Sequence, residues 1–276
     1  MSVGPVVVSL FLIAGGAAVT RVLARRLSSD PRVSLILLTS FGLRVAVAIA
    51  LYSISALRLP ILPHLHMEDG FWRITRDAQA YHWLSIAIAE SMRWGTEYPL
   101  FRYFGDPDFP ILVAAVYRLI GAHPLYIPLL NALCWTGVLA LVYALADRLN
   151  GPRGAIAATA VVAFWPSSFI WSGQLMKDSV ILLLVLGLLT QFVVTFDRGW
   201  GSPRTVLGWL GFLPLAFLMT RMRFYLVPLG LAAAAVVVAG RMLWPMRKSD
   251  LGEMIDPRAD PAKRLFDQAR GYHLDE

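Results

Sequence analysis

Seven long apolar runs dominate this sequence and restrict what it can fold into. A helix needs about 20 apolar residues to cross the roughly 30 Å of hydrocarbon in a bilayer. Only 16% of the residues are charged, against about 25% in soluble domains, and the mean hydropathy is +0.61. We therefore predict an all-α, polytopic transmembrane helix bundle. The runs cover residues 3–24, 33–57, 124–146, 155–172, 177–196, 205–220 and 224–245.

The basic residues between these runs predict how the chain is oriented. They fall in four groups: Arg21, Arg25, Arg26 and Arg32; Arg148 and Arg153; Arg198 and Arg204; Arg241, Arg247 and Lys248. Because cytoplasmic loops are enriched in Lys and Arg, placing all four groups inside requires an outside N-terminus and about seven or eight spans. Residues 58–109 then form an extracytoplasmic loop of a transmembrane domain of residues 1–245. Residues 246–276 form a polar cytoplasmic tail.

Two apolar segments need separate interpretation. The first run lacks the basic residues that precede the apolar core of a signal peptide, so we expect a retained span. Residues 110–121 are apolar but would form only about 18 Å of helix. If they crossed the membrane, Asp77 and Lys177 would lie on opposite faces. We expect a tilted or re-entrant piece, which is permitted where protein buries it.

Residues 77–94, DAQAYHWLSIAIAESMRW, are predicted to form an amphipathic juxtamembrane helix in the extracytoplasmic loop. Its apolar stripe consists of Tyr81, Leu84, Ile88 and Met92, with His82, Glu90 and Arg93 elsewhere around the helix. Asp77 lies one turn before Tyr81 on the same side, which would hold a carboxylate against the bilayer. A simpler interpretation is that an Asp in a first turn is favoured by the helix dipole.

Other ionisable residues on the predicted outer face are further candidates, since such groups are costly at a membrane. They are Asp106 and Asp108 in the loop, Lys177 and Asp178 before one span, and Arg221 and Arg223 between two spans. A snorkelling Lys and an N-cap Asp would equally explain the second pair. The adjacent guanidinium groups of the third suit a phosphate, which Arg binds through two parallel hydrogen bonds.

The sequence excludes or disfavours several other classes of site. The net charge of +7 does not indicate nucleic-acid binding, because the basic residues lie in short gaps between apolar runs. The single Cys134 excludes disulfide frameworks and cysteine metal sites within the chain. Two histidines in HLHMED, His64 and His66, can chelate, with Glu68 and Asp69 nearby, but no third ligand is fixed. We predict no cofactor, and a divalent metal is not indicated.

Three ordered segments resemble the integral-membrane glycosyltransferases of the GT-C type. These are DAQAY, FPILVAAVYRLIGAHPLYIPLLNAL and LVYALADRLNGPRGAIAATAVVAFWPSSFIWSGQLMKDSVILLL, within residues 77–196. The resemblance is nearest the dolichyl- or undecaprenyl-phosphate-sugar branch, which includes protein O-mannosyltransferases and bacterial aminoarabinose transferases. It implies an extracytoplasmic active site and inversion at the anomeric carbon. Asp77 would be the general base that deprotonates an acceptor hydroxyl, and Lys177 and Asp178 would line the donor site.

The resemblance has departures that keep a second interpretation open. The family motif often has two adjacent acidic residues, whereas Ala78 follows Asp77, and the chain is shorter than most members. We expect a hexosyl- or pentosyltransferase of the bacterial cytoplasmic (inner) membrane, with Tyr81 and the residues above binding substrate. The alternative is a non-catalytic membrane subunit or lipid-carrier-binding scaffold of an envelope polysaccharide system. Expected partners are a polyprenyl-phosphate-linked sugar, membrane lipid and a membrane protein. A transporter is disfavoured because mid-span positions are almost entirely apolar.

Overall fold

The computed structural model describes residues 3–95, 108–198 and 202–223, which form helices and turns with no strand among them. The predicted all-α class is confirmed for this part of the chain. Four helical segments are long and apolar enough to cross a membrane: Gly4–Leu27, Pro31–Ala56, Tyr126–Ala163 and Asp178–Thr195. By length and composition the chain is therefore a helical membrane protein. The predicted span 224–245, the tail 246–276 and Asp106 lie outside the described residues.

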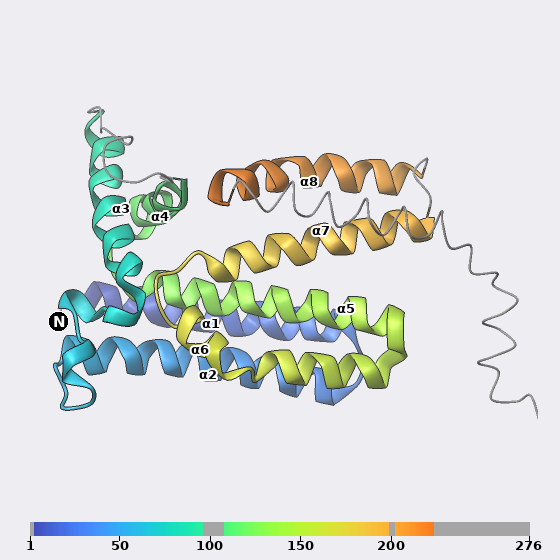
Figure 1. Ribbon diagram of the computed structural model, residues 1–276, viewed down its shortest axis with the longest axis horizontal. Coiled ribbons are helices and arrows are strands. Elements are labelled where there is room, and N and C mark those ends of the chain that lie inside the picture. The colour runs from blue at the N-terminus through green and yellow to red at the C-terminus, as the bar shows by residue number, and fades with distance from the viewer. Residues whose placement is uncertain (1–2, 96–107, 199–201, 224–276) are drawn as a thin grey trace, which may run out of the picture. The chain divides into compact units, whose positions relative to one another are not determined.

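The helices are α1 (Val3–Leu27), α2 (Pro31–Ala56), α3 (Arg76–Trp94), α4 (Asp108–Ile120), α5 (Tyr126–Ala163), α6 (Pro166–Ser172), α7 (Asp178–Arg198) and α8 (Pro203–Met222). Three 3₁₀ turns, η1 (Pro63–Leu65), η2 (Glu68–Gly70) and η3 (Arg73–Thr75), connect α2 to α3. Helix α5 is interrupted at Gly151, where φ is 70° and ψ is 179°. Figure 1 shows the chain of α5 reversing direction, so the parts of α5 before and after this break lie antiparallel. The predicted run 155–172 is not one helix, because α5 ends at Ala163 and residues 166–172 form α6.

The bundle is built from α1, α2 and α5, with α7 packed on α5 and α8 packed on α7 (Figure 1). Small residues allow the closest contacts. A Cβ atom added at Gly16 in α1 would lie 2.5 Å from the ring of Phe41 in α2, so the ring would have to move. Likewise, a Cβ atom at Gly137 in α5 would lie 2.8 Å from Leu183 in α7. Such close backbone approach is typical of helix packing in membranes.

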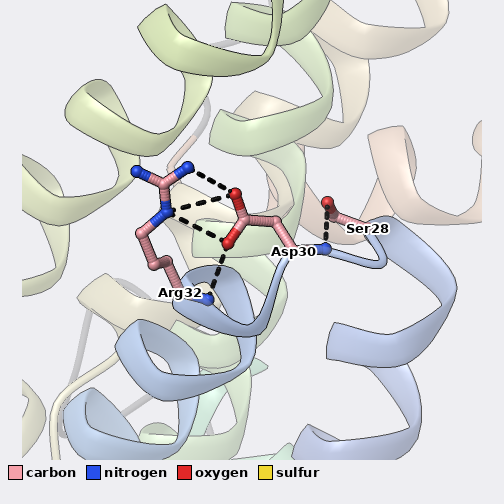
Figure 2. A network of polar contacts seen from close by, with 3 residues as sticks. All are labelled: Ser28, Asp30 and Arg32. Carbon is pink, nitrogen blue, oxygen red and sulfur yellow. Dashed lines mark hydrogen bonds and ion pairs between the residues drawn. The ribbon is translucent and has the colours of Figure 1, made fainter.

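The turn between α1 and α2 is closed by one carboxylate (Figure 2). Asp30 caps α2 by accepting a 2.9 Å hydrogen bond from the backbone N–H of Arg32, and it also pairs with the guanidinium of Arg32 at 2.7 Å. The backbone N–H of Asp30 donates to Ser28 Oγ at 3.1 Å. Hydrogen bonds from Arg32 lower the pKa of Asp30. This turn and the Gly151 reversal lie at the end of the bundle away from α3 (Figure 1).

Helices α3 and α4 pack together at the opposite end, and α3 runs across the direction of the bundle helices (Figure 1). Tyr81, Leu84 and Ile88 of the apolar stripe are buried against protein, whereas Met92 is 49% exposed. His82, which helical periodicity places off the stripe, is also buried, with 5% exposed. His82 is buried because α4 packs beside it, and the Tyr117 hydroxyl in α4 hydrogen-bonds His82 Nδ1 at 2.7 Å.

The segment between α2 and α5 leaves the bundle and returns to it at the same end. Tyr52, near the end of α2, hydrogen-bonds His123, just before α5, at 3.4 Å. Thr75, just before α3, donates to Gln174 Oε1 at 3.3 Å, which ties the segment to the start of α7. Helix α4 has 13 residues and is not among the four candidate spans.

Candidate functional site

The structure brings four of the predicted site residues together at the α3 end of the bundle. Lys177 Nζ, at the start of α7, lies 6.0 Å from the ring centroid of Tyr81 in α3 and donates to the Met222 carbonyl in α8 at 3.1 Å. Arg221 in α8 donates to Asp108 Oδ1 in α4 through Nε at 3.1 Å and through Nη2 at 3.0 Å. Four helices therefore meet around these side chains.

Lys177 is a buried cation rather than a snorkelling one, since only 6% of the residue is exposed. Its ammonium group faces the C-terminal end of α8, where unpaired carbonyl groups give a partial negative charge. The ring of Tyr81, whose face is electron-rich, lies within the range of a cation–π contact with this ammonium group. Lys177 is thus a fixed positive charge close to the surface of the α3 end.

A buried, non-helical segment before α7 holds Lys177 in this position. Asn131 in α5 donates through Nδ2 to the carbonyl groups of Gln174 and Met176, both at 3.0 Å. Asn131 is 1% exposed, so these carbonyl groups are satisfied inside the protein. Irregular backbone at membrane depth is tolerated where protein satisfies its polar groups. Sequence reasoning passed over Asn131, because a single Asn in an apolar run does not reveal its partners.

Arg221, Asp108, Arg223 and Asp178 are all more accessible than Lys177. The Arg221–Asp108 pair is partly exposed, with 51% of the Arg221 side chain and 17% of the Asp108 side chain accessible. Such pairs are worth about 0–1 kcal/mol, so a phosphate can compete with the carboxylate for the guanidinium. Arg223 is the C-cap residue of α8, and Asp178 is the half-buried first residue of α7.

Asp77 is exposed in the first turn of α3, one turn before Tyr81. No hydrogen bond or ion pair to its carboxylate is present among the described residues. An exposed carboxylate at a helix start is chemically able to accept a proton from a substrate hydroxyl.

Sequence reasoning missed Arg44, which corrects the expectation that mid-span positions are almost entirely apolar. Arg44 lies near the middle of α2 and is 1% exposed. Its guanidinium donates to the carbonyl groups of Ala163 (3.2 Å) and Ser168 (3.0 Å), at the break between α5 and α6. Two hydroxyl groups, Ser168 Oγ at 2.8 Å and Ser172 Oγ at 2.7 Å, also accept from it, while the buried Nε has no hydrogen-bond partner among the described residues. These contacts indicate a structural role at the break.

The guanidinium of Arg44 also stacks between two aromatic rings. It lies 4.1 Å from the ring centroid of Trp135 and 4.4 Å from that of Phe169. A desolvated cation gains about 2 kcal/mol or more from such a ring. The sequence signal was present, because an arginine inside an apolar run is a functional or structural marker by default.

The histidines of HLHMED do not form a metal site with neighbouring carboxylates. Within residues 3–95, 108–198 and 202–223, no group of three or more His, Cys, Asp or Glu side chains is close enough to hold a metal ion. His66 Nε2 instead hydrogen-bonds the Ile61 carbonyl at 2.8 Å, and its ring meets that of Trp72 edge-on.

Comparison with protein-family models, with curated proteins and with solved structures found no match to this chain. The resemblance to GT-C glycosyltransferases therefore depends on the sequence segments alone.

Proposed function

We propose that this chain is a membrane-embedded glycosyltransferase that moves a sugar from a polyprenyl-phosphate carrier to an acceptor hydroxyl at the extracytoplasmic face. The observation that supports it most is the meeting of four helices around Lys177 and Tyr81, with Asp77 at the start of one of them. A carboxylate and a set of cations at one end of a membrane bundle are the groups this reaction requires.

The chemistry divides between two sides of the site. Asp77 accepts the proton of the acceptor hydroxyl, whose oxygen attacks the anomeric carbon as the bond to the carrier phosphate breaks. The configuration at that carbon inverts, and polyprenyl phosphate leaves with its bonding electron pair. Negative charge grows on the phosphate, and Lys177, with Arg221 and Arg223, supplies the opposing charge. Asp178, at the start of α7, lies beside the position of the donor phosphate. Tyr81 and Asp108 contact the sugar or the acceptor as substrate-binding residues.

The proposed orientation is based on the basic residues in the short turns between the apolar runs. The α1–α2 turn and the Gly151 reversal, which lie away from α3, carry Arg32 and, close to Gly151, Arg148 and Arg153. Cytoplasmic placement of that end puts the α3 end outside, in a protein of about seven or eight spans. We propose the bacterial cytoplasmic membrane as the location, with lipid and a further membrane protein as partners.

A second candidate is a non-catalytic subunit that binds the lipid carrier. It is favoured because two of the basic side chains already have hydrogen-bond or ion-pair partners within the protein. Lys177 donates to the Met222 carbonyl and Arg221 pairs with Asp108, contacts that a purely structural role explains. Ala78, next to Asp77, is buried and provides no second carboxylate.

Asp77→Asn distinguishes the two candidates, with Glu90→Gln as a matched control because Glu90 is another exposed carboxylate of α3. The protein in lipid nanodiscs would be given radiolabelled polyprenyl-phosphate sugars and candidate acceptors, and the release of polyprenyl phosphate measured. Loss of a general base lowers the rate about 10²–10⁴-fold. We expect that loss for Asp77→Asn alone, with unchanged thermal unfolding in both variants. Equal rates in wild type and Asp77→Asn would remove Asp77 from the mechanism.

A further inference from the structure

The connection between α2 and α3 is held firmly against the end of α2. Ser55 Oγ in α2 donates to the Phe71 carbonyl at 2.7 Å, and the indole N–H of Trp72 donates to the Leu51 carbonyl at 2.8 Å. Met67 and Phe71 are joined by a further backbone hydrogen bond of 2.9 Å. The fold therefore fixes this connection from both ends.

The backbone of this connection is strained. Arg58, Leu62 and Asp69 have φ values of 50°, 52° and 60°, in the left-handed region that side chains other than glycine rarely adopt. Each such residue costs of order 1 kcal/mol or more, and clusters of them occur at ligand-binding sites, where surrounding contacts maintain them. Gly70, at φ 83°, follows directly.

An open cavity of about 680 Å³ lies inside this connection, and its lining is strongly basic. Arg58, Arg73 and Arg76 line it, together with His66 and a single carboxylate, Glu68. With a neutral His66 these side chains sum to a charge of +2, from three Arg and one Glu. None of Asp77, Tyr81, Lys177, Asp108 and Arg221 lines the cavity, although the lining residue Arg76 directly precedes Asp77.

The three guanidinium groups are exposed. Among the residues that the structure describes, none of them makes a hydrogen bond or ion pair with another side chain. Like charges gathered in one hollow repel each other, and a bound anion removes that repulsion. Arg76 is the first residue of α3, so the positive end of the helix dipole adds to the same potential.

We propose that this cavity binds a phosphate group, presented either by the headgroup of an anionic membrane lipid or by a small soluble phosphorylated molecule. The planar guanidinium group of Arg binds phosphate oxygens through two parallel hydrogen bonds. Three such groups around one cavity provide more donors than a single arginine at the membrane surface would. The proposal does not depend on the transferase function, because binding is measured without any sugar transfer.

The test uses the full chain in lipid nanodiscs and the double variant Arg73→Gln/Arg76→Gln. Arg93→Gln is the matched control, since it removes one exposed arginine from the same helix outside the cavity. Native mass spectrometry would count retained phosphatidylglycerol, and calorimetry would measure the binding of glycerol 3-phosphate. We expect the double variant to weaken whichever probe binds by about tenfold or more, and Arg93→Gln to change it by less than twofold.

The two probes distinguish the sources of the phosphate. Retention of phosphatidylglycerol without binding of glycerol 3-phosphate indicates a lipid headgroup, and the opposite result indicates a soluble ligand. Equal binding of both probes by wild type and double variant overturns the proposal, as does an equal loss in Arg93→Gln. If the double variant fails to fold, Arg58→Gln, in the strained connection rather than in a helix, applies the same criterion.

Discussion

Replacing Arg44 with methionine should destabilise the protein by about 3 kcal/mol, a value that follows from the groups its guanidinium satisfies. The Ser168 carbonyl would lose its guanidinium donor, and the Ala163 carbonyl would lose one of two donors, because Ser40 Oγ also donates to it at 3.2 Å. A buried polar group left without a partner costs about 1–3 kcal/mol and one that keeps a second donor costs less, which gives about 2–4 kcal/mol for the two. Removing the charge also recovers part of its desolvation cost, which brings the expected value to the lower half of that range. Methionine fills much of the same volume, so a large cavity does not add to it.

The measurement is the free energy of unfolding of the purified protein in mixed micelles. Arg32→Met is the control, because the Arg32–Asp30 pair is largely exposed, with 69% of the Arg32 side chain accessible, and such pairs contribute about 0–1 kcal/mol. Arg44→Lys should fall between the two, since one ammonium group cannot serve both carbonyl groups and both hydroxyl groups. A loss in Arg44→Met no larger than that in Arg32→Met would refute the reasoning.

Two further predictions concern the α3 end. Gly70→Ala should lower the unfolding free energy by about 2 kcal/mol or more, because φ is 83° and the new Cβ atom would lie 2.4 Å from the ring of Tyr52. Gly121→Ala, at φ 88° with no atom within 4 Å, isolates the backbone part, and equal losses in both variants would contradict the predicted clash. Burial lowers the pKa of His82 to about 4, below the value of about 6.5 in the unfolded chain. The unfolded state then binds more protons between these values, so stability should fall as the pH drops from about 6.5 to about 4 and stay level above that range. After allowance for solvent screening the loss is about 2 kcal/mol, and urea titrations across this range should show a flatter slope for His82→Gln.

The sequence was sufficient to predict most of the helices, because apolar length and 3.6-residue periodicity are local properties. The reversal at Gly151 also fits a local signal, since a Gly–Pro pair separates two apolar runs. The 3.6-residue spacing placed Tyr81 and Ile88 on one face of α3, and both are buried. Residues 110–121 form a helix as their apolar composition indicated, and their tilted or re-entrant placement stays a prediction.

The parts that could not be predicted depend on contacts between distant segments. Arg44 was visible in the sequence, but its partners at Ala163 and Ser168 lie more than a hundred residues away. Helical periodicity places His82 off the apolar stripe. It is buried nonetheless, because it forms a hydrogen bond with the hydroxyl of Tyr117 in α4. The basic cavity depends on left-handed backbone at Arg58, which no residue pattern required.

The contacts of Arg44 also have a consequence for how the protein is made. During synthesis α2 enters the membrane before its partner Ser168 exists, since 124 residues separate the two. At about 5–20 residues per second, the ribosome needs on the order of ten seconds to supply them. An arginine at the centre of an isolated helix costs about 2.5–3.5 kcal/mol on insertion. Until α6 has emerged, the apolar residues of α2, whose mean hydropathy is 2.1, must offset this cost without the partners of Arg44.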